Sequence, residues 1–228
     1  MVAGRARVIL PDVMTPFFIT FEGLDGSGKS THLERFSKRL QEKEVDHVVA
    51  REPGGTPLGK AVRRIFLDHR WEGMDGRVEA LLLFASRRQL LLEVVDPALA
   101  AGRHVLCDRF TDSTFAYQGA GRGVSWREIE VLSEISTGLK KPDRTLLFDL
   151  PAEEARNRGQ SDDRRATPGG VDRLDAEQLG FYERVRQGYL DLAARDPERY
   201  RLVDSGGSHE ITERQVSEAL GDLFGTEP

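Results

Sequence analysis

The sequence predicts an α/β fold in which a parallel sheet is flanked by helices on both faces. Short runs rich in β-branched and aromatic residues alternate along the chain with longer segments of helical spacing, and a glycine-rich turn joins the first such run to the first helical segment. Strand–helix–strand units of this kind form right-handed crossovers, which place their strands parallel in one sheet. A chain of 228 residues suffices for one such domain.

The individual elements follow from local patterns. Leu33, Phe36 and Leu40 recur at helical spacing and predict a helix with one apolar face. Pro97 is expected to stop the long leucine-rich helix that precedes it. The expected strands are 17–22, 45–50, 104–107, 145–148 and 201–203. The expected helical segments are 33–40, 58–66, 78–95, 126–136, 182–192 and 211–223.

Composition restricts the class of protein. The formal net charge of -5 argues against a general nucleic-acid binder, and no apolar run reaches the roughly 20 residues of a membrane span. The single cysteine, Cys107, lies in an apolar run and has no partner within the chain, which favours a reducing cytoplasm. Residues 1–16 have no strand or signal-peptide pattern and are expected to form a flexible extension before a domain at 17–228. Met14 is a hypothetical alternative start.

The turn after the first strand predicts a phosphate-binding loop. Its sequence, GLDGSGKS, has the G-x-x-x-x-G-K-S spacing between a strand and a helix. Gly23, Gly26 and Gly28 let the backbone turn its N–H groups around an anion, Lys29 adds a positive charge, and the Ser30 hydroxyl can ligate magnesium. The predicted triphosphate-binding residues are Gly23, Asp25, Gly26, Ser27, Gly28, Lys29, Ser30 and Thr31.

The positions of the arginines narrow the range of possible activities. A phosphate loop alone permits GTPases, motor ATPases, transport ATPases and small-molecule kinases, but no N-K-x-D guanine-reading motif is present. Basic residues cluster at Arg51, at Arg87 and Arg88, at Arg109 and within 156–175. These clusters indicate a second phosphate-bearing ligand that faces the first, as in a nucleotide kinase. The segment 156–175 is rich in Arg, Asp and Gly without periodicity and predicts a functional lid, with a surface insert as the alternative.

Several segments together resemble the thymidylate kinase family. They are FEGLDGSGKST at 21–31, REPGGTPLG at 51–59, LLLFASRR at 81–88, DRFTDSTFAYQGAGRG at 108–123 and PDRTLLFDL at 142–150. The resemblance extends from about Phe17 into the C-terminal helix. It implies a three-layer P-loop fold and transfer of a phosphoryl group from ATP, with magnesium, to dTMP. It also implies a homodimer, with the helix at 78–95 as a plausible contact.

The resemblance also implies roles for the acceptor site. Arg51 and Arg109 match arginines that hold the 5′-phosphate of dTMP, a task suited to the guanidinium fork. Phe84 matches the aromatic residue that stacks on thymine, and Arg88 matches the arginine that reaches the base. At the position before that arginine, where the family commonly has Asp, this chain has Arg87.

Two further positions concern the base edge and the sugar. Thr114 matches a hydrogen-bonding partner of thymine, and Tyr117 matches a tyrosine that crowds the 2′ position of ribose. Asp25 and Asp108 are the carboxylates expected near the sugar and the magnesium ion, which Ser30 and Asp108 would ligate. Adenine is expected toward Arg156 and the turn 204–207.

The acceptor phosphate needs no general base, so alignment and charge neutralisation must lower the barrier. Lys29 and Arg109 are the expected catalytic residues, together with an arginine that bridges the transferring group. Members of the family carry that residue either in the phosphate loop or in the lid. This chain has Gly26 in the loop, which favours the lid. The lid arginines are Arg158, Arg164, Arg165 and Arg173, of which Arg158, Arg164 and Arg165 are the catalytic candidates.

Two other activities remain open from the sequence. One is a kinase for another nucleoside monophosphate or for a deoxynucleoside. The other is a regulatory module that binds ATP without phosphorylating a metabolite, although Lys29, Ser30, Asp108 and Arg109 argue against it.

Overall fold

The computed structural model describes residues 15–159, 173–174 and 176–224, and these form a parallel five-stranded sheet. The strands are β1 (Phe18–Gly23), β2 (His47–Arg51), β3 (His104–Asp108), β4 (Arg144–Asp149) and β5 (Tyr200–Asp204). Their order across the sheet is β2-β3-β1-β4-β5, with β1 at the centre. All five carboxyl ends therefore lie at one edge, and the predicted parallel sheet is confirmed.

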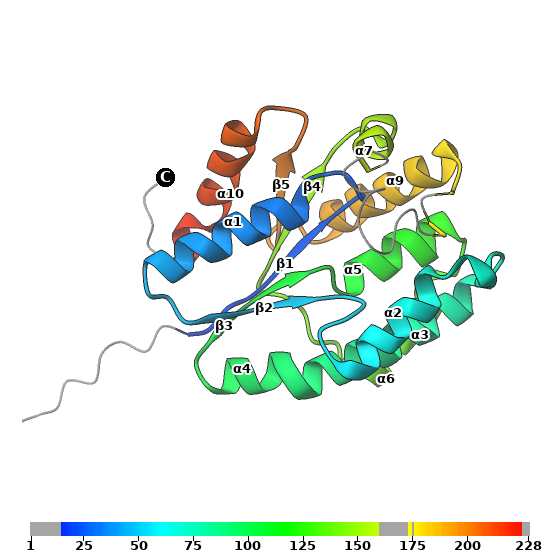
Figure 1. Cartoon of the computed structure of the whole chain (residues 1–228), viewed down its shortest axis with the longest axis horizontal. Helices are drawn as coiled ribbons and strands as arrows, with labels where there is room; N and C mark the ends of the chain where they lie inside the picture. Colours follow the sequence, from blue (N-terminus) through cyan, green and yellow to red (C-terminus); the bar gives the residue numbers. More distant parts are fainter. Residues whose placement is uncertain (1–14, 160–172, 175, 225–228) are drawn as a thin grey trace, which may run out of the picture.

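Helices cover both faces of the sheet, as the sequence predicts. Helices α1 (Lys29–Glu42) and α10 (His209–Phe224) lie on one face, and Figure 1 shows them on the opposite side of the sheet from α4 (Asp96–Ala100). The layer that contains α4 also includes α3 (Gly76–Leu90), the π-helix η2 (Leu91–Val95), the π-helix η3 (Phe115–Gly121) and α9 (Leu179–Arg195). The remaining helices are α2 (Pro57–Leu67), η1 (His69–Trp71), α5 (Thr111–Thr114), α6 (Trp126–Thr137) and α7 (Ala152–Gly159).

Strand alternation distributes the core between the two faces. Ile19 and Phe21 of β1 pack with Leu33 of α1 and with Leu220 of α10. Phe18 points to the opposite face, where it joins the cluster formed by β3, η2 and α4. Because successive strand residues alternate sides, one central strand supports both helical layers.

The region around the long leucine-rich helix differs from the prediction. Asp75 caps α3 by accepting a hydrogen bond from the Arg77 N–H, so the helix begins two residues earlier than expected. Pro97 does not stop it, because the chain passes through η2 and continues as α4 with Pro97 in the first turn. A proline in that first turn needs no N–H partner.

The segment after β3 is also helical, although the sequence predicts only a polar region there. It forms α5 and η3, which pack against α9. At the contact, Gly188 of α9 lies so close to η3 that a Cβ atom there would come within 2.6 Å of Ala120 Cβ. This close approach brings the next residue, Tyr189, to the carboxyl ends of β1 and β3, where it bonds to Glu22 and Arg109.

Several predictions concern residues outside the described ranges. Residues 1–14 cover nearly all of the expected extension, and residues 160–172 and 175 cover most of the expected lid, with Arg164 and Arg165. Both expectations stay predictions. In the portion of the chain that is described, no helix has the length and apolar character needed to cross a bilayer.

Candidate active site

The loop between β1 and α1 has the backbone geometry of an anion site. Gly26 and Gly28 have φ values of 86° and 83°, which side-chain-bearing residues rarely adopt. Gly28 caps the amino end of α1, so free N–H groups and the helix dipole face the loop. A Cβ at Gly26 would come within 2.0 Å of the Ala155 carbonyl oxygen. Helix α7 therefore packs directly on the loop and leaves no space for a side chain there.

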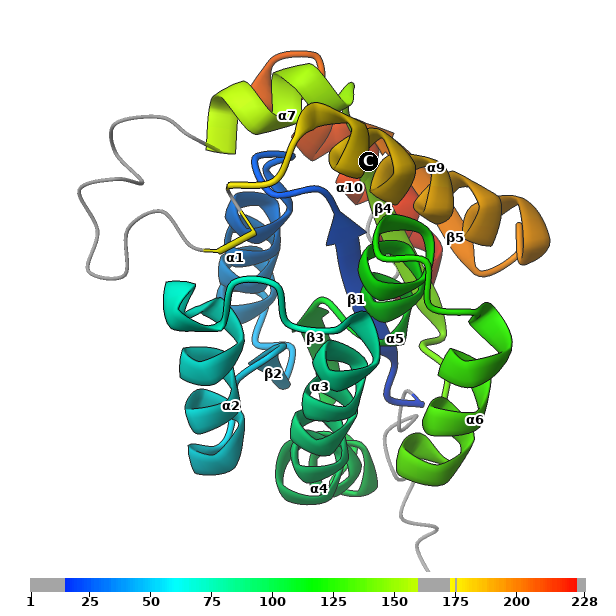
Figure 2. The same cartoon turned by 90° about the vertical axis from the view of Figure 1, so that its right-hand side faces the viewer.

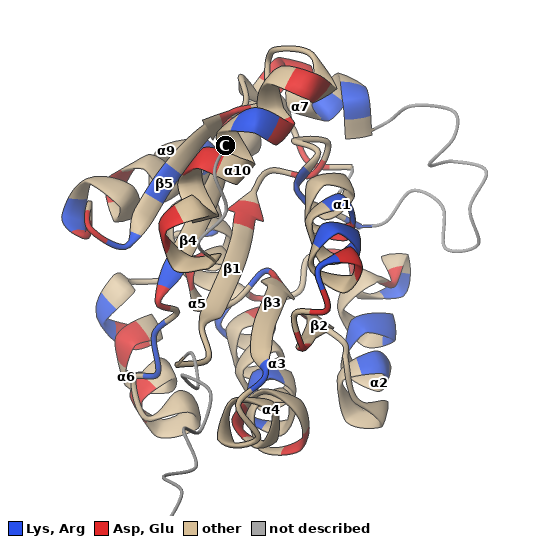
Figure 3. Ribbon diagram, turned by 90° about the vertical axis from the view of Figure 1, so that its left-hand side faces the viewer, with Lys and Arg blue, Asp and Glu red and all other residues tan. Residues whose placement is uncertain are grey.

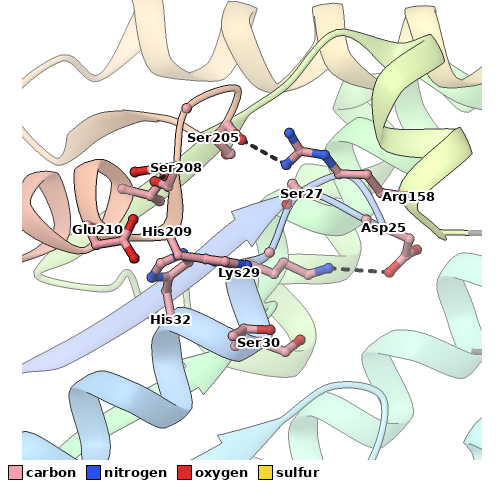
Figure 4. Close-up of a pocket in the computed structure, with 15 residues that line it drawn as sticks. Asp25, Ser27, Lys29, Ser30, His32, Arg158, Ser205, Ser208, His209 and Glu210 are labelled. Atoms are coloured by element: carbon pink, nitrogen blue, oxygen red, sulfur yellow. Dashed lines mark hydrogen bonds and ion pairs between the residues drawn. The ribbon is translucent and has the colours of Figure 1, made fainter. Parts of the chain in front are cut away.

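A cavity of about 740 Å³ opens over this loop (Figure 4). Arg158 of α7 lies across it and donates a 2.8 Å hydrogen bond from Nη1 to the Ser205 carbonyl oxygen. The turn after β5 forms the far side of the cavity. Its lining residues are Asp25 to His32, Arg158, Ser205, Gly207, Ser208, His209, Glu210 and Thr212.

Two histidines that the sequence analysis does not assign lie in this cavity. The His32 and His209 rings are 5.6 Å apart, and His32 also stacks on Phe148 at 5.8 Å. Burial lowers the pKa of His32 to about 4, with a smaller contribution from nearby His209, so the ring is neutral at physiological pH. Its Nδ1 is buried without a hydrogen-bond partner. A neutral, stacked imidazole is suited to contact with a nucleobase.

Lys29 lies at the base of the loop and is nearly fully buried. Its Nζ is 3.3 Å from Asp25 Oδ1 and 3.4 Å from the Leu24 carbonyl oxygen. Burial lowers the pKa of Lys29, and the positive charge of Arg109 lowers it further, whereas Asp25 acts in the opposite direction. An anion in the loop would compensate the positive charges of both Lys29 and Arg109.

The Ser30 hydroxyl and the Asp108 carboxylate fit a magnesium site of the kind that leaves most coordination to phosphate and water. Ser30 Oγ donates to Asp108 Oδ2 at 2.7 Å, and Arg51 Nε lies 3.5 Å from the same oxygen. Asp108 Oδ1 is buried without a partner, so one oxygen is available. No cluster of three or more acidic, His or Cys ligands occurs within the described ranges, so these residues alone do not enclose a metal ion.

A second cavity lies beside the first, and Asp25 borders both. The Arg109 guanidinium enters it, where Nη2 donates to Asp25 Oδ1 at 3.0 Å and to the Tyr117 hydroxyl at 3.1 Å. The lining residues are Asp25, Arg51, Glu52, Pro53, Arg63, Phe66, Leu67, Leu83, Arg87, Arg109, Ser113, Thr114, Tyr117, Gln118 and Leu174. The structure thus brings together the predicted Arg51, Arg109, Thr114 and Tyr117.

Arg87, not Arg88, reaches this cavity. The Arg87 side chain is buried, and it donates to Glu52 Oε2 at 2.7 Å and to Thr114 Oγ1 at 3.1 Å. Its Nη1 has no partner. Arg88 is exposed and lines neither cavity, so the structure does not support the expected base contact. The spacing of Leu83, Arg87 and Leu90 on one helix face is the signal that distinguishes the two arginines.

Phe84 is likewise absent from both cavities. It packs with Val124 and Ile129, and the Arg87 guanidinium carbon lies 4.7 Å from the centre of its ring. Phe84 therefore supports Arg87 from behind, while Phe66 and Leu83 provide the apolar walls of the second cavity.

Two lid-region arginines also differ from expectation. Arg156 does not line the first cavity, whereas Arg158 does. Arg173 is buried and pairs with Glu79 at 2.6 Å, and it donates two hydrogen bonds to the Phe66 carbonyl oxygen. Arg173 thus contacts α2 and α3 and lines neither cavity.

Comparison with known proteins identifies the family. The family model described as Thymidylate kinase matches residues 21–216. The chain belongs to the thymidylate kinase family. It is 49% identical over 211 residues to the thymidylate kinase of Ectopseudomonas mendocina (strain ymp), a match that covers 92% of this chain and 98% of that protein.

Other relatives match over a similar extent. The chain is 47% identical to the thymidylate kinase of Pseudomonas putida (strain F1), over 92% of this chain and 98% of the relative. It is 46% identical to the thymidylate kinase of Paraburkholderia phytofirmans (strain PsJN), over 90% and 98%. The predicted resemblance and the predicted P-loop fold are confirmed.

Proposed function

We propose that the chain transfers the γ-phosphoryl group of ATP to dTMP and forms dTDP. The observation that carries this proposal is the pair of adjoining cavities that share Asp25. One contains the phosphate loop with Lys29, and the other contains Arg51 and Arg109. A donor and an acceptor phosphate bound in these cavities meet beside Asp25, which is the arrangement that phosphoryl transfer requires.

The unpaired groups of the second cavity complement the edge of thymine. Arg87 Nη1 is a buried donor without a partner, and Gln118 Oε1 is a buried acceptor without one. Thymine offers the reverse pair, because its O4 accepts and its N3–H donates. Leu83 and Phe66 supply apolar contact for the ring and its methyl group. Leaving both polar groups unpaired would be costly, so the cavity favours thymine over cytosine, whose N4 amino group donates and whose N3 accepts.

The phosphate and sugar contacts follow from the same cavity. Arg51 and Arg109 hold the acceptor 5′-phosphate, and Arg109 exchanges its contact with Asp25 for phosphate oxygens. Tyr117, whose hydroxyl bonds to Asp25 and Arg109, lies against the sugar and disfavours a 2′-hydroxyl. Thr114 acts through Arg87, because its hydroxyl accepts a hydrogen bond from Arg87 Nη2.

Charge neutralisation takes the place of a general base. Ser30 and Asp108 would hold magnesium, which would supply positive charge at the transferring group. Lys29 and the loop N–H groups hold the donor phosphates, and Arg158 extends from α7 into the same cavity. His32, His209 and the turn after β5 accommodate the adenine.

The exposed apolar side chains on α2, α3 and α6 support a homodimer. These helices pack side by side in one layer (Figure 2). The side chains are Leu58, Ile65, Val78, Leu81, Val131 and Ile135. Exposed apolar side chains on neighbouring helices are typical of a protein interface. The buried free thiol of Cys107 is compatible with the cytoplasmic location that we also propose.

A substrate panel tests the function. With ATP and magnesium, we expect the highest kcat/KM for dTMP among dTMP, dUMP, dCMP, dGMP and thymidine, measured as ADP release. A preference for thymidine would contradict the proposal, and so would ATP binding without turnover.

Variants of the two adjacent arginines of α3 test which of them contacts the base. We expect E52Q/R87M to raise KM for dTMP by about 10- to 100-fold, the effect of losing a hydrogen bond to a charged group. The double change avoids a buried unpaired carboxylate. R88M should keep the wild-type KM. Equal effects of the two variants, measured by steady-state kinetics, would reject the assignment.

The lid arginines are tested singly. Arg158, Arg164 and Arg165 are each replaced by alanine. For the arginine that bridges the transferring group, we expect kcat to fall by on the order of 10³. KM for dTMP should change little. Wild-type kcat in all three variants would show that the lid supplies no catalytic charge.

Oligomeric state is tested by light scattering at micromolar concentration. We expect a dimer for the wild type and a monomer for Leu81→Glu, because a charge would be placed in the apolar interface. Leu202→Glu is the matched control, since Leu202 is similarly exposed but lies on β5. A wild-type monomer, or a monomer in both variants, would contradict the proposed interface.

A further inference from the structure

Arg109 has a backbone conformation that its sequence neighbours alone would not produce. Its φ is 73°, in the left-handed region that favours glycine. Three contacts hold the peptides around it. The Arg109 N–H donates to the Phe21 carbonyl oxygen, the Cys107 thiol donates to the Arg109 carbonyl oxygen, and the Phe110 N–H donates to Glu22 Oε1 at 2.6 Å. A strained conformation at a functional residue persists only when its surroundings impose it.

The Arg109 side chain is held by the same carboxylate. Glu22 Oε2 accepts from Ser113 Oγ at 2.6 Å and from the Tyr189 hydroxyl at 3.0 Å. Both hydroxyl oxygens in turn accept from Arg109 Nη1, at 2.9 Å and 3.0 Å. Glu22 therefore acts on Arg109 by two routes, one through the backbone and one through the guanidinium.

Glu22 itself has no access to a ligand. It is fully buried in β1 and lines neither of the two cavities. We propose that Glu22 is a positioning residue, which holds Arg109 in the orientation that receives the acceptor phosphate. This inference rests on the proposed function, because it assigns Arg109 to that phosphate.

A carboxylate suits this position for a chemical reason. All three groups that meet Glu22 are donors, and an ionised carboxylate only accepts. A glutamine amide would direct its NH2 group either at the Phe110 N–H or at the Ser113 and Tyr189 hydroxyls, so one of these sets of donors would lose its acceptor. In either case one of the two routes that orient Arg109 would be weakened.

The charge state of Glu22 is sensitive to pH near neutrality. Burial, with a smaller contribution from the negative charge of Asp112, raises the pKa of Glu22 to about 7, although Arg109 acts in the opposite direction. The other titratable groups that face it are Tyr189 of α9, Tyr200 of β5 and Cys107 of β3. Protonated Glu22 resembles glutamine, because it too loses part of its capacity to accept.

Glu22→Gln tests the inference in the full-length protein. At pH 8 we expect KM for dTMP to rise by about 10- to 100-fold, the range for hydrogen bonds to a charged group, with KM for ATP unchanged. The ratio of variant to wild-type KM should fall as the pH is lowered from 8 to 6, since wild-type Glu22 then becomes protonated. Because dTMP ionises in the same way in both assays, its ionisation does not affect the ratio. An equal rise in both KM values would overturn the inference.

Second variants separate positioning from folding. S113A/Y189F removes the hydroxyl route and should raise KM for dTMP in the same direction, even if E22Q fails to fold. Asp112→Asn is the matched control, because Asp112 is a buried carboxylate that pairs with Arg199 and does not bond to Arg109. It should keep the wild-type KM for dTMP at pH 8. A rise as large as that of E22Q would overturn the inference.

Double variants locate the route of the effect. In an Arg109→Lys background, E22Q should raise KM for dTMP little further. Combined with Arg51→Lys, which changes the other phosphate arginine, its effect on KM for dTMP should be additive. A full effect of E22Q in the Arg109→Lys background would reject the proposed route. A wild-type protein that does not phosphorylate dTMP would overturn the function as well, whereas wild-type KM in E22Q would overturn only this inference.

Discussion

The contact between Arg109 and Asp25 joins the two halves of the site. Asp25 belongs to the phosphate loop, and Arg109 follows β3 on the acceptor side. The two strands that carry them are hydrogen-bonded neighbours, β1 and β3, so a parallel sheet is what makes the contact possible. Lys29 meets the same carboxylate oxygen, which places two cations on one anion. An anion bound there would compensate the positive charge further.

Two buried ion pairs lie in and beside the acceptor cavity. Arg87 pairs with Glu52, and Arg173 pairs with Glu79, with all four side chains almost inaccessible. Burying ion pairs brings little net stability, because desolvation offsets the attraction. Their value here lies in geometry, since Arg87 is held with one donor free in the cavity.

Figure 3 shows other Lys and Arg residues on the ribbon, including bands on α2 and α7.

The fold was largely predictable, because it depends on local patterns. Alternating strand and helix periods and one glycine-rich turn suffice for a parallel sheet with two helical layers. Pro97 and the helices that follow β3 differ from the sequence-based prediction for a common reason. Two π-helices, η2 and η3, place extra residues within the turns, and they depend on packing that no short sequence window reports.

The fold class, the phosphate loop and the residues at the strand ends follow from the sequence alone, because loop chemistry and strand termini are local properties. Three-dimensional packing was needed to establish which of two adjacent arginines faces the acceptor cavity and that Phe84 lies behind it. A helix turns about 100° per residue, so neighbours such as Arg87 and Arg88 point in different directions, and packing against α6 and the strand ends selects one. The grouping of Glu22, Ser113 and Tyr189 around Arg109 likewise required the fold, because these residues come from three separate elements.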